Sequence, residues 1–233
     1  MKWEMRVGML ALILGVVLWI RPSHDSVLIY GLPGCLFLAW CMALRLGWRT
    51  MWFRWVWLLL PLLAAIPFLL PDRPIPVQPL RAAYLAKMGR LEGVRYVWGG
   101  ENEQGVDCSG LPRVGIRGAL LDQGWRTANG GAFREWARQW WFDASAKALG
   151  EGYRGYTRPL GISGVLREID VTLLQPGDLA VTANGRHVMI YYGDGKWIQA
   201  DPVASKVVIA KPAEYQSAWF SAEVSVHRWT LLW

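Results

Sequence analysis

The sequence has few cysteines, few histidines and few charged residues. Only 3 of its 233 residues are Cys and 3 are His, and charged residues make up 18%. Cys35 and Cys41 lie in one apolar stretch, so neither a disulfide framework nor a zinc-ligand spacing is available. We therefore expect no metal and no cofactor. The third cysteine, Cys108, is a solitary thiol that is either an inert buried residue or a reactive one.

Basic segments are also missing. The net charge is +7, but the part up to Pro76 contributes +4 of it and the longer remainder only +3. No basic run and no nucleic-acid-binding motif occurs, so the positive charge gives no support for a DNA or RNA partner. The arginines near the apolar stretches account for much of it.

Long uncharged runs are abundant, and they lie near the N-terminus. The chain is 53% hydrophobic, and its first 70 residues are nearly all apolar. Runs of this length can cross a bilayer, and prolines such as Pro61 and Pro67 are tolerated there. The first run lacks the small-residue cleavage site of a signal peptide, so we expect it to be retained. The prediction for residues 1–70 is a transmembrane region with about three helices, at about 7–20, 26–44 and 52–70.

The basic residues between these stretches predict the orientation. Lys2 and Arg6 precede the first stretch, and Arg45, Arg49 and Arg54 lie between the second and third, whereas the first loop has a single Arg. Positive loops stay in the cytoplasm, so everything after the third stretch is expected outside. This predicts a multi-pass protein of the bacterial inner membrane whose soluble domain is extracytoplasmic.

The rest of the chain has the pattern of one α+β domain. Residues 71–79 contain four prolines and predict an extended linker, and residues 80–233 form the domain. Helical periodicity predicts helices at 80–91, from about 109 to 121, and at 133–149. Period-two patterns with turn signals then predict five strands of an antiparallel sheet, at 179–182, 187–192, 196–200, 206–210 and 223–229.

Cys108 has surroundings that could make it reactive. It lies in Asp107-Cys108-Ser109-Gly110, at the expected start of a helix, where the backbone dipole favours a thiolate. A thiol nucleophile also needs a base. Of the three histidines, His24 lies in a loop between membrane segments and His227 near the C-terminus. His187 opens a strand after a hairpin turn and is the best candidate.

An orienting partner for His187 is available on the next strand. Gln199 lies there, and Asp201 follows two residues on, on the same face. Each of these residues also has a structural interpretation, because lone cysteines at helix starts and histidines on strands are more often part of a core. The Trp-rich helix at 133–149 is likewise either core, a wall of a substrate cleft or an edge resting on the bilayer. From the residues alone, the trio supports an enzyme only weakly.

Three motifs in order resemble those of the NlpC-type cell-wall cysteine peptidases, a papain-like family. The first is Tyr96-Val97-Trp98-Gly99-Gly100 followed by Asp107-Cys108-Ser109-Gly110-Leu111. The second is Gln175-Pro176-Gly177-Asp178-Leu179, and the third is His187-Val188-Met189-Ile190-Tyr191 followed by Trp197-Ile198-Gln199-Ala200. The resemblance runs from about residue 80 to the C-terminus.

The resemblance implies roles for particular residues. Cys108 would be the nucleophile, His187 the general base and then acid, and Gln199 the residue that orients it. Tyr96, Ser109 and Asp107 would lie at the substrate and oxyanion region. The implied substrate is the stem peptide of peptidoglycan, cut at an amide bond without a metal; protein partners are unknown.

The sequence departs from the family pattern at three places. Pro112 stands where an aliphatic residue is usual, the segment 121–171 is longer than a minimal domain needs, and Gln199 replaces a more frequent His. An amide can hold an imidazole tautomer but cannot stabilise its cation by charge. Two alternatives therefore stay open: a thiol-dependent acyltransferase or amidase acting on a lipid or small amide, and a silent wall-binding membrane protein.

Overall fold

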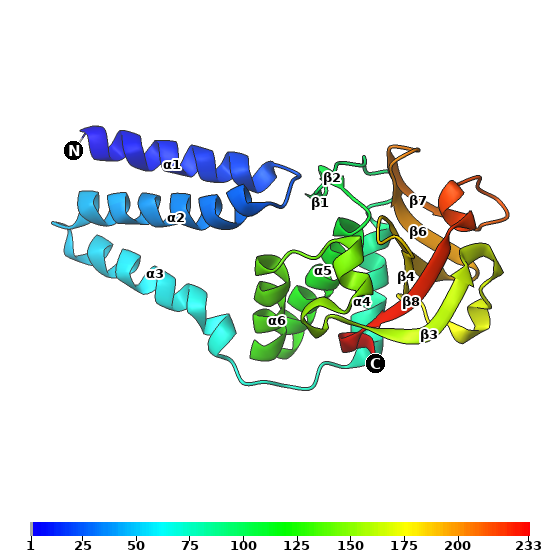
Figure 1. Ribbon diagram of the computed structural model, residues 1–233. Helices are drawn as coiled ribbons and strands as arrows, with labels where there is room; N and C mark the ends of the chain where they lie inside the picture. The colour runs from blue at the N-terminus through cyan, green and yellow to red at the C-terminus, as the bar shows by residue number, and fades with distance from the viewer. Residues whose placement is uncertain (1) are drawn as a thin grey trace.

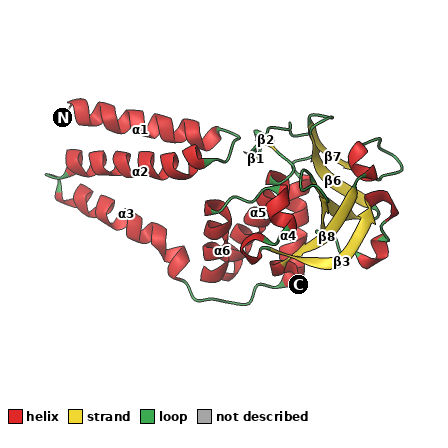
Figure 2. Cartoon of the chain, in the orientation of Figure 1, coloured by secondary structure: helices red, strands yellow, loops and turns green. Residues whose placement is uncertain are grey.

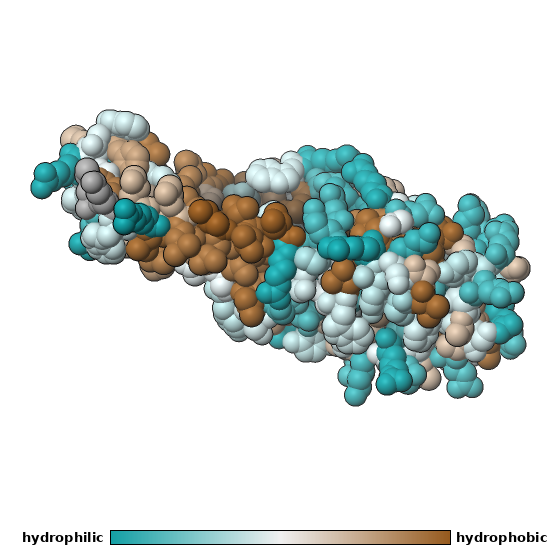
Figure 3. Space-filling model, turned by 90° about the horizontal axis from the view of Figure 1, so that it is seen from above, coloured by the Kyte–Doolittle hydropathy of each residue, from teal (hydrophilic) through white to brown (hydrophobic). Residues whose placement is uncertain are grey.

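Three long N-terminal helices project from a separate α+β domain in the computed structural model, which describes residues 2–233 (Figure 1). The three are α1 (Lys2–Ile20), α2 (Ser26–Gly47) and α3 (Met51–Leu69). Each is long and apolar enough to cross a membrane. Hydrophobic residues gather over this part of the molecule, and hydrophilic ones cover much of the domain (Figure 3). The helices lie where the apolar stretches predict them, with ends that differ by a few residues.

Successive helices of this group run in opposite directions, so α1 and α3 both run toward the domain and α2 runs away from it (Figure 1). The loop between α1 and α2 and the C-terminal end of α3 both lie on the side of the domain, and the loop between α2 and α3 lies at the far end (Figure 1). Close packing joins α1 to α2, with Gly8 against Met42 and Gly15 against Cys35. This arrangement is the one that the predicted orientation requires, because the Arg-rich loop lies opposite the domain.

Helices come first in the domain and strands follow (Figure 2). The helices are α4 (Val77–Gly89), α5 (Gly110–Thr127), α6 (Gly130–Trp141) and α7 (Ala146–Gly150). The six-stranded antiparallel sheet has the order β3 (Thr157–Val165), β8 (Glu223–Trp229), β4 (Leu179–Thr182), β5 (Val188–Gly193), β6 (Lys196–Asp201) and β7 (Lys206–Ala210). A hairpin of β1 (Glu101–Asn102) and β2 (Gly105–Val106) precedes α5. Short 3-10 turns lie at Tyr153–Gly155, Leu166–Glu168, Val171–Leu173, Ala218–Ser221 and Thr230–Leu232.

The sheet is buried on both faces. Alternate residues such as Val188 and Ile190 of β5 face a core shared with α4 and α5, which includes Tyr84. The residues between them, such as Met189, face a second core under the segments that flank the sheet on its other side. Because successive side chains of a strand point to opposite faces, the strands read as continuous apolar runs. The predicted α+β class is confirmed.

Helices α4 and α5 approach closely at Gly115, and this contact gives a stability prediction. A Cβ on residue 115 would lie 2.6 Å from Met88 Cγ and 2.8 Å from the ring of Tyr84, inside the core. Gly115→Ala is therefore expected to lower the free energy of unfolding by about 1–3 kcal/mol through overpacking. Gly118→Ala is the matched control, because its Cβ would meet only the flexible Lys87 side chain at 3.1 Å. Denaturant unfolding followed by Trp fluorescence measures both, and equal effects would contradict the packing argument.

Three elements differ from the sequence predictions. Helix α4 begins at Val77, inside the predicted linker, because Pro79 fits the first helical turn. The helix expected at 133–149 is two helices with a break at 142–145, and α5 continues to Thr127. Strand β3 was not predicted. It is an edge strand that contains Pro159, Gly161 and Gly164, three residues that mask a strand pattern.

Candidate active site

Cys108 lies two residues before α5, in a turn that only glycine allows to close. Gly110, the first residue of the helix, lies against the carbonyl of Gly100, and a Cβ there would overlap that oxygen. Cys108 is 6% exposed and contributes to the main core. The thiol therefore lies at a helix start, as predicted. It is buried, however, and not open to solvent.

Asp107 and Ser109 hold this turn together. Asp107 Oδ1 accepts from the Gly110 N–H at 2.6 Å and from Ser109 Oγ at 3.0 Å, and its Oδ2 accepts from the Gly99 N–H at 2.8 Å. Ser109 is the N-cap residue by position, yet its hydroxyl bonds to Asp107 and not to the helix. Burial raises the pKa of Asp107, and the backbone donors counteract it. Both residues line the cleft, but their polar atoms are committed to the loop.

His187 is held between two side chains. It precedes β5 by one residue, is 1% exposed, and its Nε2 lies 2.7 Å from Gln199 Oε1 on the neighbouring strand β6. The amide oxygen accepts a hydrogen bond from Nε2–H, so Nδ1 is the unprotonated nitrogen of the neutral ring. Trp219 stacks on one face of the His187 imidazole ring, with a distance of 4.1 Å between the ring centroids and an interplanar angle of 17°. The predicted pair of His187 and Gln199 is thus in contact, whereas Trp219 was missed.

One cavity of about 620 Å³ brings the predicted residues together. Cys108, His187 and Tyr96 all line it. Within the described residues the thiol and the imidazole share no hydrogen bond, and Cys108 Sγ instead donates to the Arg186 carbonyl at 3.8 Å. Sequence reasoning assigned no site role to several other lining residues, among them His24, Trp98, Asp143, Pro202 and Trp219.

Burial governs the protonation of both groups. It raises the pKa of the Cys108 thiol to about 12, with a further contribution from the charge of Asp107, while backbone N–H groups including that of Val188 act in the opposite direction. Burial also lowers the pKa of His187 to about 4, against a smaller raising effect of the Gln199 hydrogen bond. The expectation of a thiolate favoured by the helix dipole is therefore wrong for the unliganded site. The resting pair is a neutral thiol and a neutral imidazole.

The lowered pKa of His187 predicts an acid-dependent loss of stability. The unfolded chain binds a proton at this residue below pH 6.5, whereas the folded chain does so only below about pH 4. Stability is therefore full above pH 6.5 and is lost as the pH falls through this window, by about 3 kcal/mol. Unfolding free energies of the full chain and of His187→Gln, measured from pH 7 to 4, test this. The variant is expected to have the flatter profile, and parallel profiles would contradict it.

Two other polar residues of the motifs have structural contacts. Asp201 accepts hydrogen bonds from its own turn at Val203 and Ala204, and from Tyr215 and Ser217, so it fixes loops. It acts on His187 through its charge, which raises the pKa of the imidazole. In the second motif, the Asp178 carboxylate binds the Arg228 guanidinium through both oxygens, at 2.7 and 2.9 Å. That motif therefore ties β4 to β8.

A buried charged cluster lies at the other end of the cleft. The Glu101 carboxylate is 5% exposed and pairs with both Arg113 and Arg117, and Arg113 also pairs with Asp143. His24 Nδ1 lies 3.5 Å from Glu101 Oε2. Ligand atoms of His24, Glu101 and Asp143 lie within 4.8 Å of one another, the spacing of a metal site. Two guanidinium groups already neutralise these carboxylates, so the residues present do not fit a metal.

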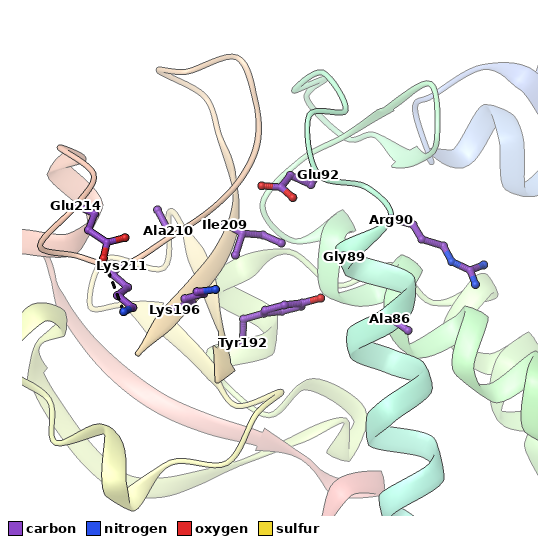
Figure 4. A pocket seen from close by; sticks show the side chains of 10 residues that line it. All are labelled: Ala86, Gly89, Arg90, Glu92, Tyr192, Lys196, Ile209, Ala210, Lys211 and Glu214. Carbon is purple, nitrogen blue, oxygen red and sulfur yellow. Dashed lines mark ion pairs between the residues drawn. The ribbon is translucent and has the colours of Figure 1, made fainter. Parts of the chain in front are cut away.

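A second cavity, of about 490 Å³, lies away from the cleft (Figure 4). It lies between the C-terminal end of α4 and the strands β6 and β7, with Tyr192 and Lys196 at its base and a Lys211–Glu214 ion pair at its rim. Cys108 and His187 do not line it. The chemistry-bearing residues of the motifs are thus confined to the cleft.

Comparison with solved structures gives distant matches. The peptidoglycan hydrolase RipB from Mycobacterium tuberculosis is 20% identical, with a TM-score of 0.40 over 65% of this chain and 67% of that one. An NlpC/P60 family protein from Bacillus cereus is 20% identical (TM-score 0.42; 66% and 41%), and NlpC1 from Trichomonas vaginalis is 17% identical (TM-score 0.42; 66% and 45%). The chain thus spans less than half of the latter two. A search of curated proteins finds no match.

The family comparison is more extensive. The model of the NlpC/P60 family matches residues 93–226, which is more than half of the chain. The match includes Cys108, His187 and Gln199, together with the whole of the second motif. It confirms the resemblance that the three motifs indicate, and the chain belongs to the NlpC/P60 family.

Proposed function

We propose that this chain is a membrane-anchored cysteine hydrolase that cleaves an amide bond in the stem peptides of peptidoglycan. The observation that carries the proposal is the cleft itself, in which Cys108 and His187 line one cavity and Gln199 binds the imidazole at 2.7 Å. Membership of the NlpC/P60 family supports the class of reaction and substrate. The family neighbour from M. tuberculosis is itself described as a peptidoglycan hydrolase.

The neutral resting pair defines the first step. As Cys108 Sγ attacks the substrate carbonyl, its proton passes to Nδ1 of His187, so base catalysis accompanies bond formation. The backbone N–H of Cys108 stabilises the oxyanion. His187 then gives the proton to the leaving amine, and a thioester remains on Cys108. Water hydrolyses the thioester with His187 again as base, which restores the thiol and releases a carboxylic acid.

Gln199 and Trp219 support His187 in this scheme. Gln199 keeps the proton of the neutral ring on Nε2 and leaves Nδ1 toward the cleft, while the stacked Trp219 limits rotation of the ring and excludes water from it. Tyr96 lines the cleft beside Cys108, and burial raises the pKa of its hydroxyl. A hydroxyl that stays protonated can donate to the substrate carbonyl, which is the role proposed for Tyr96.

The three N-terminal helices form the proposed anchor. Helices α1, α2 and α3 have the length and composition of membrane spans, and most of their large apolar side chains are exposed. The two connections nearest the domain lie on one side of this bundle, and the Arg-rich loop lies on the other (Figure 1). This geometry supports an extracytoplasmic domain of an inner-membrane protein, on the side where peptidoglycan lies.

Fragment analysis tests the function. The full chain in detergent is incubated with purified peptidoglycan, and the soluble products are separated and identified by mass. New amine and carboxyl ends within the stem peptide are expected with the wild type and not with Cys108→Ala. Identical products from the two proteins would exclude the proposal.

A further inference from the structure

The loop 21–25, which joins α1 to α2, is bound to the edge of the active-site cleft. It meets the segment 99–102 next to β1 through an isolated β-bridge between Ser23 and Gly100. Three hydrogen bonds make the junction. Two join the backbones and form the bridge between Ser23 and Gly100: the His24 N–H donates to the Gly99 carbonyl at 2.7 Å, and the Glu101 N–H donates to the Pro22 carbonyl at 2.9 Å. The third runs from the Asn102 side chain, whose Nδ2 donates to the Arg21 carbonyl at 2.7 Å.

His24 turns this junction into a wall of the cleft. The residue is 6% exposed and lines the same cavity as Cys108. Its ring meets Trp140 of α6 edge-on, at a centroid distance of 5.5 Å. Neither ring nitrogen makes a hydrogen bond with the described residues. Burial lowers its pKa, so the ring is neutral. Nδ1 faces Glu101 Oε2 at 3.5 Å, which leaves Nε2 as the ring nitrogen that can bind a molecule in the cleft.

The lengths of the connections fix how far this wall lies from the helices. Helix α1 ends at Ile20 and α2 begins at Ser26. Since a chain spans at most about 3.6 Å per residue, His24 lies within about 7 Å of the start of α2 and about 15 Å of the end of α1. The headgroup region on each side of a bilayer is about 5–8 Å thick. With α1 and α2 in the membrane, the cleft is therefore at the level of the headgroups or just above them.

Aromatic side chains on the same side of the domain fit that depth. Trp98 lines the cleft, is 81% exposed, and precedes Gly99, which binds the loop. Trp141 of α6 is 43% exposed and meets Tyr30 of α2 edge-on at 5.8 Å. Exposed Trp side chains concentrate at membrane–water interfaces. An exposed Trp beside a cleft does not by itself indicate a depth in the membrane. Here, however, the segment that contains Trp98 binds the loop between the apolar helices α1 and α2.

From these positions we infer that the cleft takes its stem peptide while the peptide is still attached to a membrane lipid, with His24 as a binding residue contributed by the membrane hairpin. The inference rests on the proposed function and specifies its substrate. A peptide carried on a lipid is held at the bilayer surface, where the cleft lies.

Matched substrates test this inference. The full chain is reconstituted in phospholipid nanodiscs together with a disaccharide–stem peptide on a polyprenyl diphosphate, and its cleavage is compared with that of the same disaccharide–peptide freed from the lipid and with that of polymeric peptidoglycan. At least tenfold faster cleavage of the lipid-linked form at equal concentration is expected. Equal or faster cleavage of either lipid-free substrate would overturn the inference and leave the proposed function standing. Failure to cleave any of the three would exclude both.

Insertions in the loop between α1 and α2 test the position of the cleft relative to the membrane without changing the catalytic residues. Four residues, Gly-Ser-Gly-Ser, are placed between Ile20 and Arg21 and again between His24 and Asp25, which keeps Asp25 as the cap of α2. The preference for the lipid-linked substrate is expected to fall to about twofold, with cleavage of the free peptide unchanged. The same insertion between Pro74 and Ile75, in the linker, is the control and should retain the preference. An unchanged preference in the loop variant would contradict the inference.

His24 itself is tested by its effect on binding. His24→Ala is expected to raise KM for the lipid-linked peptide about tenfold with little change in kcat, because the ring contacts substrate and not the reacting atoms. His227→Ala is the matched control, since His227 is a buried histidine on β8 that bonds to Ser225 and does not line the cleft. If the His24 variant has the wild-type KM, His24 is a structural residue and does not bind substrate. The same conclusion holds if the only change is a shift of the thermal midpoint equal to that of the control.

Discussion

Cys108→Ala in the full chain is expected to reduce the release of stem-peptide fragments by at least about 10³-fold. The expected loss is this large because the thiol is the proposed nucleophile, and the binding contacts that remain provide no covalent route. The same variant should keep its thermal midpoint within a few degrees, because it removes only one sulfur from a 6% exposed position. Residual activity within tenfold of wild type would exclude Cys108 as the nucleophile.

The partner of His187 adds a finer test of the same chemistry. Gln199→Glu is nearly isosteric and places a carboxylate 2.7 Å from Nε2, so it should raise the imidazole pKa and move the acidic limb of the kcat–pH profile to higher pH. Gln199→Ala removes the acceptor and should lower kcat by up to about 10²-fold through misorientation. If neither variant changes the profile or kcat, Gln199 does not orient the base.

Arg113→Met is expected to lower the free energy of unfolding by about 3–5 kcal/mol. Arg113 is fully buried, pairs with Glu101 and Asp143, and donates to the carbonyls of Gln139 at 2.8 Å and Phe142 at 3.3 Å. Its loss leaves Arg117 as the one guanidinium paired with Glu101, and it removes a donor from the buried Gln139 carbonyl and from the half-buried Phe142 carbonyl.

A surface arginine provides the control for this prediction. Arg138→Met removes an ion pair with Glu135 at 2.7 Å, but the Arg138 side chain is 41% exposed, so the cost should stay below about 1 kcal/mol. Chemical unfolding of the full chain in one detergent compares the two variants. Similar losses in both would show that burial of the Arg113 cluster contributes nothing.

The same arginine explains why part of the fold could not be predicted from sequence. The periodicity of residues 133–149 is that of one helix, but Arg113 of a different helix binds the carbonyls at 139 and 142 and opens a break there. Ser145 then caps α7 through the Ala148 N–H. The break depends on a side chain about 30 residues earlier, so a local pattern does not contain it.

The residues of the site likewise divide into those that local motifs predict and those that only the packing of distant segments brings to the cleft. Cys108, His187 and Gln199 lie in local motifs, and those motifs predicted the contacts of His187 and the shared cleft. His24 and Trp219 reach the cleft only through the packing of distant segments. The predicted thiolate state of Cys108 was also wrong. A helix start in the sequence indicates a dipole that favours the thiolate, but it does not indicate how deeply the thiol is buried, and burial favours the neutral form. Trp219 has one weak signal, a tryptophan just before the last strand.

The linker between α3 and α4 is bound along its length. Asn129 accepts from the Arg73 N–H at 3.1 Å and donates to the Arg73 carbonyl at 2.7 Å, and the Gly130 N–H donates to the Pro71 carbonyl at 3.0 Å. Arg134 binds the carbonyl of Phe68 and the Asp72 carboxylate. A domain held in this way does not move freely on a flexible linker. With the proposed anchor and the proposed lipid-linked substrate, its encounters would be set by lateral diffusion, and its rate would depend on surface density and not on bulk concentration.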